Sequence, residues 1–373
     1  MNENIFWKLL LELKELCEAN QITYFLGGEI LRYSQAVSEE KRALAPPMGA
    51  DFGGIELYMD GANAKKLLAL EKELPCDRML EHPLRNPKFR NLDIYYIDKT
   101  STYIDFECLD RRECLGAFIP IRIIVPNYNG PRQSFNLKLE RMWRTSFSYH
   151  HSFSTVSPKE EKLYEPFRKL GGDGDFVTVN TFRYLLNTKL TSETSVRVYT
   201  RRSRKLVWSR FFKGKRLVTI NGVSFVTVKE TEAFLKCVFG SEWAEVNFRA
   251  PSRYLDENRS YPSFEKKLYH NDAFWKRRGV MRHIRQSSRV IYHVAEDNWT
   301  MATDIYAGIK EQDDLLTKKE VLLRMQELED YTGILGVMVR YKKVLLMQDQ
   351  YGIEIDPLLK EIYQKAMTVL EIE

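Results

Sequence analysis

Two glycines and a carboxylate are the first residues whose types and spacing suggest chemistry. Gly27 and Gly28 follow a short apolar run and precede a helix-like segment over residues 29–37. Glycine lets the backbone approach an anion closely, and the first amide groups of a helix point outward without partners, so this junction is typical of a phosphate-binding site. Glu56 lies in a second short run, and a carboxylate on an adjacent strand can hold a divalent cation against that phosphate.

A second carboxylate would complete a cation site. Side chains alternate along a strand, so Glu56 and Tyr58 share one face of a strand over residues 55–59, and Asp105 alternates in the same way within residues 102–106. If these two strands are neighbours in one sheet, Glu56 and Asp105 converge and need a cation between them, which predicts a Mg²⁺ (or Mn²⁺) site. The other interpretation is that both carboxylates face solvent on a half-exposed sheet.

A basic stretch later in the chain suggests a different chemistry. Four arginines spaced four, three and four residues apart would form one stripe on a helix: Arg278, Arg282, Arg285 and Arg289. Guanidinium groups on one face suit a polyanion such as nucleic acid, a phosphate-rich polymer or an anionic membrane surface. The alternative is a solvated helix face paired with acids elsewhere in the fold.

These residues require a sheet with helices packed on it. An amphipathic helix is predicted over residues 5–17, and an Asp60-capped helix over residues 63–73. Strand-like runs occur at residues 22–26, 55–59, 92–97, 102–106 and 119–125, with a hairpin predicted across residues 98–101. A second hairpin is predicted to turn at Asn221-Gly222, followed by a helix over residues 230–239 that ends at Gly240.

The predicted fold is therefore α/β (α+β), a small mixed sheet flanked by helices over residues 1–250 and a mainly helical region over residues 251–373. Hydrophobic residues make up 44% and charged residues 29%, which is an ordinary globular composition. The net charge of +6 permits anionic partners without requiring nucleic acid. Five cysteines without a CxxC pair, no secretory signal and no bilayer-length apolar stretch favour a cytoplasmic location, with work at the inner face of a membrane left open.

Four segments resemble a known family. The segment from Tyr24 to Arg32 stands where that family has its glycine-containing segment, Lys88-Phe89-Arg90 matches a Lys-x-Arg stretch, and Ile104-Asp105-Phe106 matches an Ile-Asp-(Ile/Val)-Phe strand. Residues 211–243 are similar to its closing hairpin and helix. In this order of elements the chain resembles the LicD family of phosphotransferases, the cholinephosphotransferase-like branch of the nucleotidyltransferase superfamily.

The resemblance implies a nucleotidyltransferase-like fold and a Mg²⁺-dependent enzyme. Such an enzyme would move a phosphocholine-like group from a cytidine-diphosphate-activated alcohol to a sugar hydroxyl of a cell-surface glycan such as lipopolysaccharide or teichoic acid. Gly27 and Gly28 would hold the donor phosphates, with Arg32, Lys88 and Arg90 adding positive charge. The metal would be held by Glu56, Asp105 and Asp51, and Asp105 would take the proton from the acceptor hydroxyl.

One departure from the family pattern concerns the metal ligands. The family has a run of aspartates ending in Asp-x-Asp, whereas this chain has Gly54 and Glu56 at the two positions and Asp51 three residues upstream of Gly54. Loss of one ligand weakens binding of a hard cation. Two alternatives to the active transferase therefore remain: a catalytically impaired relative that binds a nucleotide, glycan or protein, and a polynucleotide-directed nucleotidyltransferase that uses the arginine stripe.

Overall fold

The computed structural model of this protein describes most of the predicted elements. The described residues are 5–36, 54–87, 89, 91–105, 116–126, 162, 165, 175–189, 195–199, 204–244, 253–262, 299–341 and 356–371. By its internal contacts the chain divides into two units, the first holding the elements from α1 to α8 and the second the helices from α13 to α17.

The first unit alternates helices and strands. In chain order its elements are α1 (Ile5–Ala19), β1 (Phe25–Gly27), α2 (Gly28–Ala36), β2 (Ile55–Asp60), α4 (Gly61–Ala69), the 3₁₀ helix η1 (Glu71–Glu73), β3 (Arg78–Glu81), β4 (Ile94–Asp98), β5 (Thr102–Asp105), β6 (Phe118–Pro126), α7 (Asp175–Asn187), β7 (Ser195–Tyr199), β8 (Arg204–Trp208), the 3₁₀ helix η3 (Ser209–Phe212), β9 (Lys215–Ile220), β10 (Val223–Val228) and α8 (Thr231–Phe239). Strand β11 (Arg253–Asp256) follows and pairs with β5.

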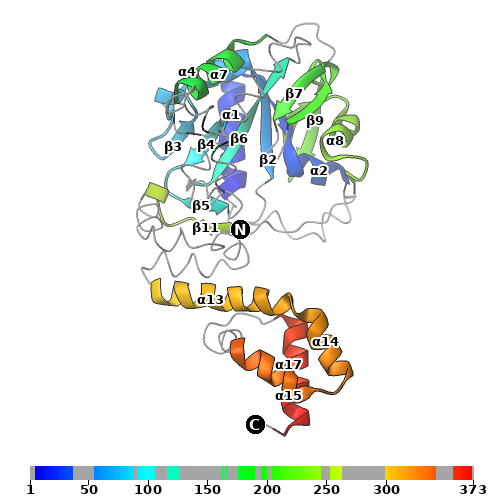
Figure 1. Cartoon of the computed structure of the whole chain (residues 1–373). Helices are drawn as coiled ribbons and strands as arrows, with labels where there is room; N and C mark the ends of the chain where they lie inside the picture. The colour runs from blue at the N-terminus through cyan, green and yellow to red at the C-terminus, as the bar shows by residue number, and fades with distance from the viewer. Residues whose placement is uncertain are drawn as a thin grey trace. The chain divides into compact units, whose positions relative to one another are not determined.

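Among the described residues, seven strands form one mixed sheet (Figure 1). Its order is β1-β2-β6-β4-β3, and β7 joins β6 to β8. β2 runs antiparallel to β1 and parallel to β6, while the other pairings are antiparallel. The register places Gly27 opposite Glu56 and Tyr58 opposite Arg122. The mixed α/β architecture predicted for this part of the chain is confirmed.

Both faces of β2 are covered. Ile55, Leu57 and Met59 are buried on one face, as the alternation predicts. On the other face Tyr58 is also fully buried, with ring centroids 6.3 Å from Phe212 and 5.7 Å from Phe234. The expectation of a half-exposed sheet is therefore wrong at Tyr58, because η3 and α8 bring aromatic rings over that face.

The hairpin β9–β10 and helix α8 form as predicted, with β10 beside β1 and α8 against β8 and β10. Asn221 and Gly222 both have positive φ, 50° and 77°, which is the type I′ turn that a two-residue hairpin favours. Gly240, with φ of 97°, ends α8 as expected. The Thr227 hydroxyl donates to the Leu26 carbonyl at 2.8 Å, which joins β10 to β1.

The predicted hairpin between residues 92–97 and 102–106 is wrong. β4 pairs with β3 on one edge and with β6 on the other, and β5 pairs with β11 instead. A strand has only two edges, so β3, which the sequence pattern did not reveal, leaves β4 no edge for β5.

The second unit is helical and has its own core. Its helices are α13 (Trp299–Leu316), α14 (Lys319–Glu327), α15 (Tyr331–Met338), the 3₁₀ helix η4 (Val339–Tyr341) and α17 (Pro357–Val369). Their apolar faces meet around a small buried cluster: Leu315, Leu322, Ile334, Met338, Leu359, Ile362 and Ala366. Helical structure is confirmed for the described residues from 299 onward.

Candidate functional site

The glycine pair lies where β1 passes into α2, and close packing already requires both glycines. A Cβ on Gly27 would lie 2.0 Å from the Tyr58 ring, so only glycine leaves room for that buried side chain. Gly28 has φ of 76°, and a Cβ there would lie 2.3 Å from the Gly54 carbonyl oxygen. The same carbonyl accepts from the Ile30 amide at 3.3 Å. Packing against the Tyr58 ring and against the backbone of residue 54 therefore accounts for these glycines without a bound phosphate.

Glu56 lies directly opposite Gly27, as expected for a carboxylate beside the glycine pair. Its side chain is 13% exposed, and both of its oxygens have partners. The Tyr58 hydroxyl donates to Oε2 at 2.9 Å, while Arg122 donates to Oε1 through Nη2 at 2.8 Å and through Nε at 3.3 Å. Burial, followed by the negative charge of Glu56, raises the pKa of Tyr58 well above its usual value, so this phenol remains a donor.

The cation beside Glu56 is a guanidinium group. Arg122 comes from the parallel neighbour β6, is 3% exposed, and donates through Nη1 to Oδ2 of Asp93 as well as to Glu56. Burial alone would lower the pKa of Arg122, but Asp93 and Glu56 outweigh it and raise that pKa well above the usual value. We call Glu56, Tyr58, Asp93 and Arg122 the Arg122 cluster. Its guanidinium stays charged because two carboxylates surround it.

The described residues of this cluster do not fit a Mg²⁺ ion. Hard cations bind several oxygen ligands at once, but both Glu56 oxygens are engaged and the fixed positive charge of Arg122 would repel a second cation at the same place. In the described part of the chain, no three His, Cys, Asp or Glu side chains gather closely enough to hold a metal ion. Two acids from separate segments do converge on a cation, but the second acid is Asp93 and not the predicted Asp105, and the cation is the guanidinium of Arg122.

Asp105 is not placed beside Glu56 by the sheet. Its backbone ends β5, which pairs with β11, whereas the neighbours of β2 are β1 and β6. The predicted adjacency of the two acidic strands is therefore wrong. Seven other predicted site residues lie outside the described part of the chain: Asp51, Lys88, Arg90, Arg278, Arg282, Arg285 and Arg289.

Arg32, expected from the family resemblance to contact phosphate, joins α2 to the turn after α8. Its Nε donates to the Trp243 carbonyl at 2.5 Å and its Nη2 to the Glu242 carbonyl at 3.4 Å. The guanidinium also lies 5.1 Å from the centre of the Phe239 ring and 3.3 Å from Glu29. These contacts give Arg32 a role in helix packing.

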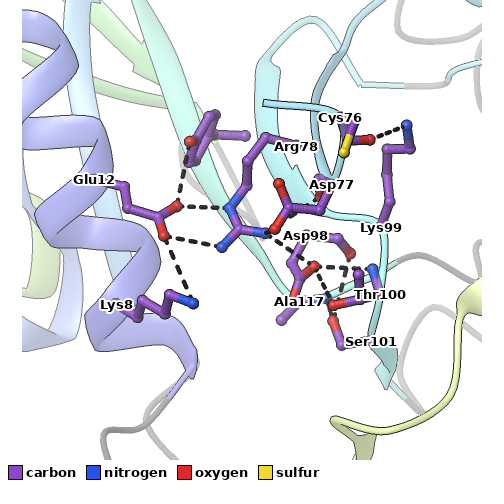
Figure 2. Close-up of polar contacts among 11 residues, drawn as sticks. Lys8, Glu12, Cys76, Asp77, Arg78, Asp98, Lys99, Thr100, Ser101 and Ala117 are labelled. Atoms are coloured by element: carbon purple, nitrogen blue, oxygen red, sulfur yellow. Dashed lines mark hydrogen bonds and ion pairs between the residues drawn. The ribbon is translucent and has the colours of Figure 1, made fainter. Parts of the chain in front are cut away.

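A second buried arginine ties α1 to the opposite edge of the sheet (Figure 2). Arg78, on β3, contacts Glu12 of α1 through Nε at 2.6 Å and Nη2 at 2.9 Å. Its Nη1 donates to Asp77 at 2.9 Å and to Asp98 at 3.2 Å. Figure 2 shows Glu12 on one side of the guanidinium and the two aspartates on the other. All the donors point at acids of the protein, so this cluster is a structural link.

A histidine beside η1 forms a third ionisable cluster. His82 is 3% exposed, its ring stacks on Phe182 of α7 with centroids 5.9 Å apart, and its Nε2 lies 3.5 Å from Glu71. Arg85 also contacts Glu71, at 2.5 Å. Burial lowers the pKa of His82 below its usual 6.5, and the nearby Glu71 only partly offsets this effect.

The site residues that the sequence pattern missed are Asp93 and Arg122. Arg122 is the single charge inside the otherwise apolar run over residues 119–125, which is a recognisable signal because an unpaired charge is not buried in a central strand. Asp93 begins the run that leads into β4, and its role depends on the pairing of β4 with β6.

Comparisons with known proteins give no match. No family model, no curated protein and no solved structure matches this chain. In the described residues, no helix has both the length and the apolar character needed to cross a membrane.

Proposed function

We propose that this protein is a catalytically impaired relative of the nucleotidyltransferase-like phosphotransferases, and that it binds a partner without transferring a phosphoryl group at Glu56. The observation that carries the proposal is the contact of Arg122 with Glu56 and Asp93. A metal-dependent transferase needs free carboxylate oxygens at this position, and here a permanent guanidinium charge occupies them.

The arrangement of elements supports the relationship to that fold. Helix α1 precedes β1, the glycine pair lies between β1 and α2, and an acidic residue on β2 faces the first glycine. β6 is the parallel neighbour of β2 and presents Arg122 beside Tyr58, where a metal-dependent relative would benefit from a further acid. A guanidinium at this point removes the need for a metal, because it balances the buried acids itself.

The second candidate function is the transferase implied by the family resemblance. It would move a phosphocholine-like group from a cytidine-diphosphate donor to a glycan hydroxyl with Mg²⁺. One observation favours it: the register brings the Glu56 carboxylate next to the β1–α2 junction, the place where a donor phosphate would bind. This function requires Arg122 to leave the carboxylates when donor and metal bind.

Calorimetric titration of the full chain with cytidine-diphosphocholine, with and without Mg²⁺ or Mn²⁺, separates the two functions. We expect no metal-dependent binding and no release of phosphocholine in the presence of a glycan acceptor. Glu56→Gln should give the same titration curves as the wild-type protein, with and without metal, because the proposal gives Glu56 no ligand role.

Metal-dependent nucleotide binding that is lost in Glu56→Gln and in Asp105→Ala would overturn the proposal in favour of the transferase. Trp208→Phe serves as a matched control, because that side chain is 52% exposed and lies outside the Arg122 cluster. Each variant is checked for the wild-type circular dichroism spectrum before titration, so that loss of binding is not confused with loss of fold.

A further inference from the structure

The outer edge of strand β9 is an open β-sheet edge in the described residues. β9 and β10 form a two-stranded sheet of their own, and β10 is the only described strand that pairs with β9. β10 is also joined to β1 through the Thr227–Leu26 hydrogen bond, so the side of the hairpin that adjoins the main sheet is its β10 side. An edge of this kind can accept an extended segment as an additional strand.

The turn geometry identifies the backbone groups on that edge. A two-residue type I′ turn at Asn221-Gly222 makes Ile220 and Val223 a hydrogen-bonded pair. Hydrogen-bonded and non-hydrogen-bonded pairs alternate in an antiparallel ladder, so the amides and carbonyls of Lys215, Leu217 and Thr219 point away from β10. The side chains of the same three residues are exposed.

Two features of the centre of this edge differ from a protected one. Leu217, at its centre, is 65% exposed, which makes it one of the most exposed large apolar side chains in the described structure. Protected edges carry a charge, a proline or a bulge at such a position, whereas the described register of β9 with β10 runs without a break over all six residues. The centre of β9 therefore combines outward backbone groups with an apolar side chain.

The charge around this edge is positive. Lys213, Lys215, Arg216 and Lys229 are all exposed. The Lys229 amide donates to the Gly214 carbonyl at 3.2 Å, which brings Lys229 beside the first residues of β9. The neighbouring acid in the chain, Glu230, is engaged with Arg210 at 3.2 Å. Lys215 also donates through Nζ to the Thr23 hydroxyl at 3.2 Å. A segment that lies along this end of the hairpin therefore enters a region of positive charge.

We propose that the outer edge of β9 binds an extended acidic peptide segment of a partner protein as an added strand. Its backbone would bond with Lys215, Leu217 and Thr219, an apolar side chain would cover Leu217, and its acidic side chains would be attracted by the positive charge at the start of β9. Nucleic acid would use the positive charge but not the outward backbone groups, so the edge favours a peptide. This surface does not include Glu56. A negative result in the peptide-binding test therefore leaves the proposed function untouched, and a negative result in the metal titration leaves the peptide proposal untouched.

Fluorescence anisotropy with a labelled peptide of about ten residues that alternates Glu with Val tests this proposal. Leu217→Pro replaces the leucine side chain and removes one backbone amide, which points away from β10. The hydrogen bonds between β9 and β10 are therefore kept. We expect this variant to weaken binding by about fivefold or more relative to Leu217→Thr, which also loses the leucine but keeps the amide. Amide exchange at residues 215, 217 and 219 should slow when the peptide binds.

Charge reversal supplies the second arm. Lys215→Glu with Arg216→Glu should weaken binding by about tenfold or more. The matched control reverses two exposed lysines of the helical unit, Lys319→Glu with Lys365→Glu, and should bind as the wild-type protein does. Equal loss in both double variants would show non-specific attraction and would overturn the proposal.

Two other outcomes would also overturn the proposal. One is equal peptide binding by Leu217→Pro and Leu217→Thr, which would show that the outward amide is not used. The other is tighter binding of a labelled oligouridine than of the acidic peptide, with affinity for the oligouridine unaffected by Leu217→Pro. That result would assign the basic residues to nucleic acid.

Discussion

Arg122 is a permanent positive charge inside a central strand, and Glu56 and Asp93 are what make its burial tolerable. Removal of such a charge leaves its partner acids buried without a counter-charge, which is strongly destabilising. Replacement of the arginine and both acids together lowers the free energy of unfolding much less. The cluster therefore contributes to stability only as a complete set. A single substitution in it should affect folding more than any role in binding.

Arg122→Met is expected to lower the free energy of unfolding by about 3–5 kcal/mol, because it leaves Glu56 and Asp93 as unpaired buried acids. The triple variant Glu56→Gln, Asp93→Asn, Arg122→Met should recover most of that loss. Urea unfolding followed by tryptophan fluorescence measures both. Equal stability of Arg122→Met and the wild-type protein would show that the guanidinium does not balance these acids.

His82 should make stability depend on pH in the opposite sense to a salt-bridged histidine. Because burial lowers its pKa in the folded state, the unfolded chain takes up a proton at His82 first as the pH falls below about 6.5. Its contribution is therefore full above that pH and is lost as the pH falls towards the folded-state value.

The comparison of wild-type protein with His82→Gln isolates this contribution. We expect the wild-type protein to lose more unfolding free energy than the variant between pH 7.5 and pH 5.5. Glu81, whose pKa burial raises above its usual 4.5, has the opposite effect, but it is present in both proteins. Parallel pH profiles for the two proteins would contradict the assignment.

Residue-level prediction succeeded where the signal was local. Glu56 lies beside the glycine pair because β1 and β2 are adjacent, as the two short apolar runs predict. The partners of Glu56 were not predictable in the same way, since Arg122 is 66 residues away in the chain and Asp93 contacts it across 29 residues. Which acid balances which base depends on strand order, and the local pattern does not contain that order.

At the scale of elements, the junction between β1 and α2 depends on a backbone conformation that suits glycine. Gly28 and Gly222 have nearly the same φ, 76° and 77°, but differ in surroundings. A Cβ on Gly28 would lie 2.3 Å from the Gly54 carbonyl, whereas a Cβ on Gly222 would have nothing within 4 Å. Comparison of Gly28 with Gly222 therefore separates the cost of the backbone conformation from the cost of a steric clash.

Gly222→Ala should cost about 1–2 kcal/mol of unfolding free energy, which is the price of a left-handed conformation alone. Gly28→Ala should cost at least about 1 kcal/mol more, because β1 or residue 54 must also shift. Thermal and urea unfolding of the two variants test this difference. Equal losses would show that the space around Gly28 is easily enlarged.

Element-level prediction was reliable for features that short-range signals control. The Asn221-Gly222 turn, the end of α8 at Gly240 and the Asp60 cap of α4 all formed as expected, the cap through an Asn63 amide 2.8 Å from Asp60. The hairpin between β4 and β5 failed because β3 and β6 compete for the edges of β4. Turn chemistry makes a hairpin favourable, but pairing across the sheet decides whether it forms.

At the scale of the whole molecule, the two units have separate cores. The main cluster joins α1 to the sheet and to α8, while the cluster around Leu359 contains only residues of the second unit. Separate cores allow separate losses of structure, because a cavity in one core leaves the packing of the other unchanged.

Leu359→Ala should therefore destabilise the second unit by about 2–5 kcal/mol, since Leu359 is fully buried. Amide exchange should become faster in α14, α15 and α17 and stay unchanged in β2 and β6. Leu10→Ala, in α1, is the matched change in the first unit and should give the reverse pattern. Faster exchange throughout the chain for both variants would show one cooperative core.

The long-range bonds around β1 have a consequence for synthesis on the ribosome. Leu26 receives its hydrogen bond from Thr227, and Arg32 bonds to Trp243, so partners roughly 200 residues apart must both have left the exit tunnel. At 5–20 residues per second this interval is roughly 10 to 40 seconds. β2 emerges early enough to pair with β1, but throughout this interval the other edge of β1 and the Arg32 side chain lack these partners, which exposes the nascent β1–α2 segment to chaperones.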